Sequence, residues 1–286
     1  MKPLMFIFLF VLACISLNLK AQEDKIAAMT KSVKGAYYTG SIDERQLTSK
    51  ETSATYKILI YLPVSYPETK KKYPVMILTD AYWAMGIAQT TFDLMTFYTQ
   101  EIPEVIVVGV SYPNSSLLDM TRNRHRDFLP THVEGYNPSG SADKFINFIK
   151  KELIPFVENS YRIDTSDRCY SGHSYGGLLG AHILLDQPQL FKRYIIGSPS
   201  YWWDNKEIIK RLTNKSLLAV DSIKTVYTFI GSKEGMMVKN WKEFDSILVR
   251  KLNKNIKFHD QIFQDETHMS VLPAAFSTAV KFVYKK

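Results

Sequence analysis

One pentapeptide of this chain has the residue types that can hold a reactive serine: Gly172-His173-Ser174-Tyr175-Gly176. Its G-x-S-x-G pattern is typical of a sharp turn that exposes a serine hydroxyl at the end of a β-strand. Glycines are needed there because the turn packs closely against neighbouring backbone. Residues 167–171 predict a short strand before the turn, and residues 177–185 predict a helix after it. The pattern and its flanks therefore predict that Ser174 is a nucleophile.

A serine hydroxyl needs a base to accept its proton and an acid to orient that base. In the strand-turn-helix setting, the acid and then the histidine follow the serine along the chain. Of the six histidines, His268 lies between the last predicted strand, residues 256–263, and the last predicted helix, residues 272–284. His268 is therefore the predicted base, whereas His173 is expected to pack around the turn. The other four lie in an upstream loop, a helix or a strand: His125, His132, His182 and His259.

The acid is predicted at Glu234, which lies in the loop just after the predicted strand at residues 225–230. An alternative is that Glu234 is a surface residue paired with Lys233. Asp204 follows an earlier predicted strand and is the second candidate for the acid. Three further carboxylates are disfavoured because they lie inside a strand or too close to the histidine in sequence: Asp260, Asp265 and Glu266.

Ester or amide chemistry also needs two N–H donors for the oxyanion that forms in the transition state. One is expected to be the backbone N–H of Tyr175, directly after the nucleophile. The other should come from the loop after the predicted strand at residues 75–79. By position we expect the N–H of Tyr82, with Ala81 as the neighbouring alternative.

Other chemistries have little support in the sequence. There is no H-E-x-x-H motif, no closely spaced cysteine pair, no G-x-G-x-x-G motif and no P-loop. We therefore expect neither a metal nor a cofactor. The lysines are scattered and form no recognised nucleic-acid-binding module, so no nucleic-acid partner is expected. The net charge of +8 is either a solvated basic surface or an attraction for anionic substrates.

The elements that must position these residues alternate between strands and helices. This alternation predicts an α/β fold with a doubly wound, mostly parallel sheet, in which functional groups follow the carboxyl ends of strands. The first two predicted strands are expected to form an antiparallel pair at the start of the sheet. The predicted strands, besides that before the serine, are residues 44–52, 55–62, 75–79, 105–110, 194–196, 225–230 and 256–263, and the further helices are 84–100, 142–161 (kinked at Pro155), 238–252 and 272–284.

The N-terminus predicts a secretory signal peptide over residues 1–21: Lys2 precedes an apolar run, and Ala21 ends a small-residue cleavage site. Cleavage would remove two lysines and no acid, so the net charge would fall from +8 to +6. Residues 22–286 are expected to form a single domain, periplasmic or secreted. Lipid anchoring at Cys14 is a less favoured alternative, and no membrane-spanning segment is expected after cleavage.

Several segments in order give the chain a resemblance to the putative esterase family of α/β-hydrolases, which includes esterase D-like, feruloyl, acetylxylan and siderophore esterases. The resemblance runs from about residue 50 to the C-terminus. It is carried by residues 78–83, 122–131, 152–156, 161–162, the serine pentapeptide and 197–204. It implies an α/β-hydrolase fold and looks most like the enterochelin and salmochelin esterase branch. One departure is Ala81, where the family often has glycine.

The resemblance also implies a substrate cleft. Two tryptophans would pack against aryl groups of the substrate, and three loop arginines would attract a polyanion. The alternatives are that the tryptophans pack in the core and that the arginines pair with acids. These residues are Trp202, Trp203, Arg122, Arg124 and Arg126. The expected function is an exported serine carboxylic-ester hydrolase acting on small aryl or siderophore-type esters. The alternatives are a feruloyl or acetyl esterase acting on plant oligosaccharides and polysaccharides, an acyltransferase with the same triad, and an inactive binding protein. The true substrate and the oligomeric state are not predicted.

Overall fold

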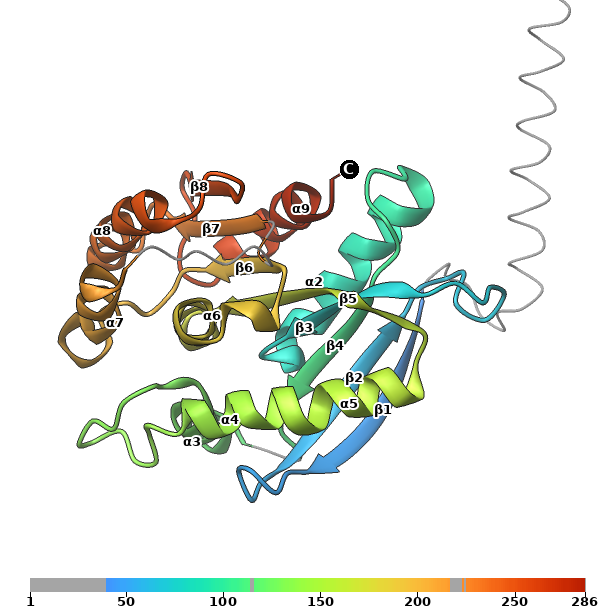
Figure 1. The fold of residues 1–286 in the computed structure, drawn as a ribbon, viewed down its shortest axis with the longest axis horizontal. Helices are drawn as coiled ribbons and strands as arrows, with labels where there is room; N and C mark the ends of the chain where they lie inside the picture. The colour runs from blue at the N-terminus through green and yellow to red at the C-terminus, as the bar shows by residue number, and fades with distance from the viewer. Residues whose placement is uncertain (1–39, 114–115, 217–222, 224, 286) are drawn as a thin grey trace, which may run out of the picture. The chain divides into compact units, whose positions relative to one another are not determined.

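Eight strands form one mixed sheet in the computed structural model, which describes residues 40–113, 116–216, 223 and 225–285. The predicted signal peptide, including Cys14, lies outside the described residues. The strand order is β1-β2-β4-β3-β5-β6-β7-β8 (Figure 1). The strands are β1 (Ser41–Thr48), β2 (Thr55–Leu62), β3 (Tyr73–Leu78), β4 (Ile106–Ser111), β5 (Ile163–His173), β6 (Arg193–Gly197), β7 (Thr225–Gly231) and β8 (Lys257–Phe263).

The sheet confirms the predicted α/β architecture. Strand β2 pairs antiparallel with both β1 and β4, and every other neighbouring pair is parallel. The central strands β3 and β5 are neighbours, but the chain continues from β3 to β4 on one side and from β5 to β6 on the other. Such a reversal of winding opens a crevice at the carboxyl ends of the two strands. Ser174 follows β5, and Tyr82, which the sequence predicted in a loop, lies in the first turn of the helix that follows β3.

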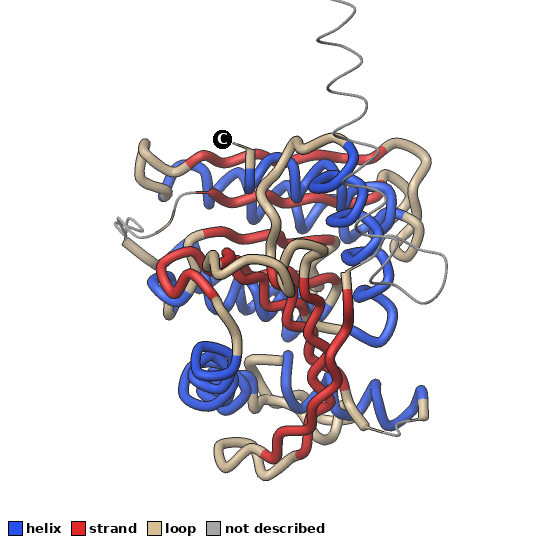
Figure 2. The backbone as a smooth tube through the Cα atoms, turned by 90° about the vertical axis from the view of Figure 1, so that its right-hand side faces the viewer, coloured by secondary structure: helices blue, strands red, loops and turns tan. Residues whose placement is uncertain are grey.

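Helices cover both faces of the sheet (Figures 1 and 2). Helices α2 (Ala81–Asp93) and α9 (Val271–Tyr284) pack together on one face, and a short π-helix, η1 (Leu94–Tyr98), continues α2. The opposite face carries α3 (Leu117–Phe128), α4 (Ala142–Phe148), the π-helix η2 (Ile149–Leu153), α5 (Ile154–Ser160), α6 (Tyr175–Asp186), the 3-10 turn η3 (Pro188–Leu190), α7 (Trp203–Asn214) and α8 (Met236–Lys251). Among the described residues, no helix is long and apolar enough to cross a membrane.

The continuous apolar runs of the central strands serve two cores. In β3, Val75 and Ile77 belong to the core beneath α3–α8, whereas Met76 and Leu78 belong to the core beneath α2 and α9. Successive side chains of a strand point to opposite faces, so a strand covered on both faces needs apolar residues at every position. This confirms the buried central strands predicted from the sequence.

Two helices lie where the sequence predicted loops or no element. Residues 122–131 were expected to be a loop, but residues up to Phe128 belong to α3, whose N-terminus is capped by Ser116 Oγ accepting from the Asp119 N–H at 3.1 Å. Only a narrow side of α3 is buried, so its apolar periodicity is weak. Helix α7 opens with three consecutive residues of positive φ, Asp204, Asn205 and Lys206, and therefore has no ordinary N-terminal signal.

The long helix predicted over residues 142–161 is present as α4, η2 and α5 in succession. The wider π-turn of η2 ends at Leu153, just before Pro155, which occupies the first turn of α5. Proline has no N–H to donate to the preceding turn, and a π-turn is one way in which a helix accommodates that loss. The predicted disturbance at Pro155 thus takes the form of a π-turn.

Candidate active site

Ser174 lies on a strained turn between β5 and α6. Its backbone has φ 61° and ψ −118°, a conformation that a non-glycine residue adopts at a cost of about 1–3 kcal/mol. Its N–H donates to the Gly197 carbonyl at 2.9 Å, and its carbonyl accepts from the Ser200 N–H at 3.2 Å. A Cβ atom on Gly176 would lie 2.4 Å from Thr79 Oγ1, so the turn needs glycine there. The turn is therefore held against the segments that follow β3 and β6.

His268 and Glu234, the predicted base and acid, are hydrogen-bonded to each other. His268 Nδ1 lies 2.6 Å from Glu234 Oε2. Glu234 follows β7 and His268 follows β8, and these strands are parallel neighbours. The Glu234 side chain is 1% exposed, whereas that of His268 is 34% exposed. A buried carboxylate thus holds one ring nitrogen of a histidine that solvent can reach.

The Glu234 carboxylate is also fixed by two other donors. Its Oε1 atom accepts from Ser198 Oγ at 2.6 Å and from the Gly231 N–H at 2.7 Å. Burial by itself would raise the pKa of Glu234, but the hydrogen bonds from His268, Ser198 and Gly231 outweigh it and hold the pKa below its usual value. Glu234 is therefore ionised at neutral pH.

His173 joins the serine turn to the loop of His268. Its Nε2 donates to the His268 carbonyl oxygen at 2.8 Å, and the two rings lie 4.7 Å apart between centroids. Burial, and then the neighbouring His268, lower the pKa of His173 to about 3. The ring is neutral at physiological pH, with its buried Nδ1 unpartnered among the described residues. The Ser174 hydroxyl likewise has no hydrogen-bond partner in the described part of the chain.

Two backbone segments carry N–H groups just after the carboxyl ends of neighbouring strands. Asp80 precedes α2 with φ 57° and ψ 38°, and its carbonyl accepts from Trp83 and Ala84. The N–H groups of Ala81 and Tyr82 have no acceptor among the described residues, and neither has that of Tyr175 at the start of α6. Both segments follow the neighbouring strands β3 and β5, as an oxyanion hole requires.

The three predicted substrate-binding arginines lie on α3 in different environments. Arg124 makes a bidentate pair with Asp80, at 2.8 and 3.0 Å. Burial raises the pKa of Asp80 and Arg124 opposes that rise. Arg126 makes a similar pair with Asp127, at 2.7 and 2.8 Å. Arg122 is exposed and has no ion pair within the described ranges. Pairing with acids therefore accounts for two of the three arginines.

The two predicted substrate-binding tryptophans also differ in their exposure. Trp203 is 2% exposed, and its indole N–H donates to Thr131 Oγ1 at 2.9 Å, so it packs in the core. Trp202 is 37% exposed, and its ring centroid lies 6.2 Å from that of Tyr175, the residue after Ser174. Trp202 is the one that borders the serine turn at the surface.

The other acids have different surroundings. Lys233 pairs with the exposed Asp265 at 3.3 Å and not with Glu234, so the surface-pair interpretation of Glu234 is wrong. The side chain of Asp204, the second candidate, has no hydrogen bond or ion pair among the described residues. Asp260 is exposed on β8. Across the described ranges, no three His, Cys, Asp or Glu side chains cluster in a way that could hold a metal ion.

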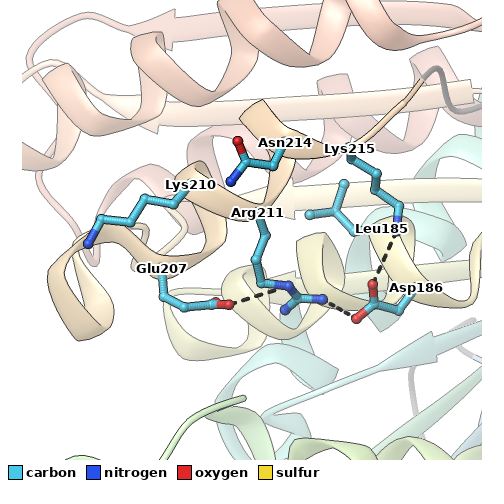
Figure 3. A pocket seen from close by; sticks show the side chains of 7 residues that line it. All are labelled: Leu185, Asp186, Glu207, Lys210, Arg211, Asn214 and Lys215. Carbon is cyan, nitrogen blue, oxygen red and sulfur yellow. Dashed lines mark hydrogen bonds and ion pairs between the residues drawn. The ribbon is translucent and has the colours of Figure 1, made fainter.

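An open pocket of about 390 Å³ lies elsewhere, between the end of α6 and α7 (Figure 3). It is lined by Leu185, Asp186, Glu207, Lys210, Arg211, Asn214 and Lys215. Arg211 bridges Asp186 and Glu207, and Lys215 also pairs with Asp186, so these charges bind one another. Ser174 lies at the opposite end of α6, which has 12 residues and is about 18 Å long. No predicted site residue lines this pocket.

Sequence reasoning missed three groups around the predicted triad. Ser198 was part of a family-like segment but had no assigned role, and its hydrogen bond to Glu234 depends on β6 and β7 being neighbours. His173 was expected to pack near the turn, without a partner. Arg124 was assigned to substrate and instead binds Asp80. The available signal was position alone, because Ser198 directly follows β6 and Asp80 lies two residues after β3.

Comparison with known proteins gives consistent matches over most of the chain. A family model described as "Putative esterase" matches residues 49–279. The ferri-bacillibactin esterase BesA of Bacillus subtilis is 30% identical over 266 residues, covering 86% of this chain and 91% of that protein. The siderophore enterobactin esterase of Emericella nidulans is 27% identical over 270 residues, covering 80% and 89%. The crystal structure of the BES protein from Bacillus cereus superposes with a TM-score of 0.77 at 27% identity, covering 89% and 98%.

Proposed function

The chain belongs to the putative esterase family, and from that premise we propose that it is a serine esterase that uses Ser174, His268 and Glu234 as its catalytic triad. The observation that carries this proposal is the 2.6 Å hydrogen bond between His268 Nδ1 and the buried Glu234 carboxylate, beside the strained serine turn. A carboxylate on Nδ1 leaves Nε2 free as the basic nitrogen and stabilises the imidazolium that forms when Nε2 takes a proton.

In the first half-reaction, Ser174 Oγ bonds to the ester carbonyl carbon while its proton passes to His268 Nε2. The carbonyl oxygen becomes an oxyanion and accepts hydrogen bonds from the backbone N–H groups of Tyr175 and Tyr82, with that of Ala81 as the alternative donor. The tetrahedral intermediate then collapses: the bond to the alcohol oxygen breaks, and His268 returns the proton to that oxygen. The alcohol leaves and an acyl-serine ester remains.

Water completes the cycle. His268 takes a proton from water, whose oxygen attacks the acyl carbon and forms a second oxyanion at the same donors. Collapse breaks the bond to Ser174 Oγ, which regains the proton, and the carboxylic acid leaves. Glu234 stays ionised throughout, because its other oxygen keeps the bonds from Ser198 and Gly231.

We propose siderophore-type aryl esters as the substrate class. The relatives named above are esterases of ferri-bacillibactin and enterobactin. Further support comes from exposed apolar side chains on segments that follow the carboxyl ends of the parallel strands, which suit an aromatic substrate. They are Tyr82, Leu117, Leu118, Trp202, Met236 and Met269.

Substitution of the nucleophile tests the chemistry. Ser174→Ala should lower kcat for a p-nitrophenyl ester by about 10⁴-fold or more. It should also abolish covalent labelling by an aryl fluorophosphonate, which intact-mass measurement detects as one adduct on the wild type. Unchanged circular dichroism and Tm show that the variant folds. Turnover by a folded Ser174→Ala protein at the wild-type rate would exclude the mechanism.

A substrate panel tests the specificity. We expect a larger kcat/KM for a ferric tris-catecholate ester than for feruloylated or acetylated xylan, and the reverse order would reject the siderophore-type assignment. The same reactions run with an added alcohol distinguish hydrolysis from acyl transfer. Free acid as the only product supports an esterase, whereas a new ester would support an acyltransferase.

We also propose export through cleavage of residues 1–21, which rests on the sequence of that segment. N-terminal sequencing of the protein from an envelope fraction should begin at Gln22. A lipidated N-terminal Cys14 would support anchoring instead, and an uncleaved Met1 in the cytoplasmic fraction would reject export.

A further inference from the structure

Arg124 contacts both segments that carry the proposed oxyanion donors. Its Nε and Nη2 atoms donate to the two carboxylate oxygens of Asp80 at 2.8 and 3.0 Å. Its guanidinium carbon lies 5.2 Å from the ring centroid of Tyr175. The side chains of Arg124 and Asp80 are 13% and 4% exposed. A single buried arginine of α3 therefore contacts both the segment after β3 and the first residue of α6.

The conformation of Asp80 determines where its neighbours point. Asp80 has a left-handed backbone, with φ 57°. Its carbonyl accepts from the third and fourth residues of the turn, Trp83 and Ala84, at 3.2 and 3.1 Å. The side chain makes no capping bond to α2, because it is turned toward Arg124. This arrangement directs the N–H groups of Ala81 and Tyr82 out of the helix, without acceptors among the described residues.

The same carboxylate also borders the serine turn. A Cβ atom on Gly176 would lie 3.6 Å from Asp80 Oδ2. Asp80 therefore lies between the segment that carries the Tyr82 N–H and the turn that carries the Tyr175 N–H, and its position affects the spacing between these two donors. A guanidinium that grips both carboxylate oxygens fixes the plane of the carboxylate, which a lysine ammonium cannot do.

We propose that Arg124 is a positioning residue: through Asp80 and Tyr175 it holds the two oxyanion donors at their working separation. This inference rests on the proposed esterase function. It also gives Arg124 a role different from direct contact with an anionic substrate. A donor displaced by about 1 Å loses much of its stabilisation of the transition state and little of its contact with the ground state.

The test is Arg124→Lys, with Arg193→Lys as a matched control. Arg193 makes the same bidentate pair with Asp167, at 2.7 and 2.9 Å, and lies 5.1 Å from the ring centroid of Tyr284. These side chains are 14% and 17% exposed, and the pair lies at the amino end of β6, on the edge opposite Ser174. Both variants should lower Tm, but only the first should alter the reaction.

We expect Arg124→Lys to lower kcat by about 10-fold or more for a neutral p-nitrophenyl ester and for an anionic one, with KM within about threefold of the wild type. Its affinity for an arylboronic acid, which forms a tetrahedral adduct with the serine, should fall by the same factor as kcat/KM. Arg193→Lys should keep kcat within about twofold. Asp80→Asn should reproduce the loss of kcat, and this variant tests the positioning role if Arg124→Lys fails to fold.

Two results would overturn the inference. One is an unchanged kcat and boronate affinity in folded Arg124→Lys or Asp80→Asn. The other is a loss confined to KM for the anionic ester, which would make Arg124 a substrate contact. Either can occur while Ser174→Ala is inactive, so the inference can fail without the proposed function failing. An active Ser174→Ala protein would instead reject the function itself.

Discussion

His173 Nε2 donates a 2.8 Å hydrogen bond to the carbonyl oxygen of His268, so the residue before the proposed nucleophile anchors the loop of the proposed base. The two residues are 95 positions apart in the chain. The contact involves the backbone of His268, which leaves its ring free to bind Glu234 and to face solvent. The base can therefore be held near Ser174 without a bond between their side chains.

Further hydrogen bonds connect this contact to the rest of the proposed triad. Ser198 bonds to Glu234, Glu234 to His268 and His268 to His173, while Ser200 donates to the carbonyl of Ser174. Acid, base and nucleophile are thus each tied to another strand end. Such a closed arrangement limits the movement of each group, which is the condition for preorganised catalysis.

Folding stability should depend on pH through the buried His173. Its pKa is about 3 in the folded protein and about 6.5 when unfolded, so between these values the unfolded chain binds the extra proton. Stability is therefore retained above pH 6.5 and lost as pH falls, by about 1.4 kcal/mol per pH unit from this group. His173→Gln keeps an N–H donor but cannot titrate. Urea unfolding between pH 6.5 and 4 should show a shallower dependence in this variant.

The exposed His259 supplies the control for this measurement. His259→Gln makes the same change at an exposed histidine, so comparing it with His173→Gln separates the effect of burial from the mere loss of an imidazole. Equal slopes for the wild type and His173→Gln would show that His173 is not held neutral by burial.

Glu234→Gln should lower kcat by about 10³-fold, because the amide cannot stabilise the imidazolium and can orient the wrong tautomer of His268. The measurement is hydrolysis of a p-nitrophenyl ester, with folding monitored by Tm. Asp265→Asn makes the same carboxylate-to-amide change at a side chain that is 91% exposed, and it should leave kcat unchanged. A loss below about fivefold in Glu234→Gln would point to a Ser-His dyad or another acid.

Gly176→Ala should destabilise the protein by about 1–3 kcal/mol and lower kcat, because its new methyl group would lie 2.4 Å from Thr79 Oγ1 and push the segment before Tyr82 away. The double variant Gly176→Ala/Thr79→Ala removes that oxygen and should recover part of both losses. Gly86→Ala, where the added carbon meets no atom within 4 Å apart from its chain neighbours and its own helix backbone, should be neutral or stabilising by up to about 1 kcal/mol. Equal Tm and kcat for Gly176→Ala and Gly86→Ala would contradict this close packing.

The adjacent tryptophans should respond in opposite ways. Trp202→Ala should raise KM for an aryl ester by about 10-fold with little change in Tm, since Trp202 is 37% exposed beside Tyr175. Trp203→Ala should cost about 3–5 kcal/mol of unfolding free energy, because Trp203 is buried and bonded to Thr131. Aryl-ester kinetics and urea unfolding of both variants measure these effects. An unchanged KM in Trp202→Ala would remove that residue from the substrate cleft.

Much of the fold was predictable because its signals are local. Continuous apolar runs identify β3 and β4 since each strand is covered on both faces. Helices α3 and α7 escaped prediction because one buries little apolar surface and the other begins with left-handed residues. The tertiary environment stabilises them where local propensity does not.

The sequence by itself determined that Ser174, Glu234 and His268 follow three strands in this order. Parallel strands end at a common edge, so that order brings the three residues to one side of the sheet. Only the tertiary structure decided that Arg124 binds Asp80, 44 residues away, and that Ser198 binds Glu234, 36 residues away. Such pairs depend on which distant segments pack together, because a side chain's partner is set by long-range packing and not by its own neighbours in the chain.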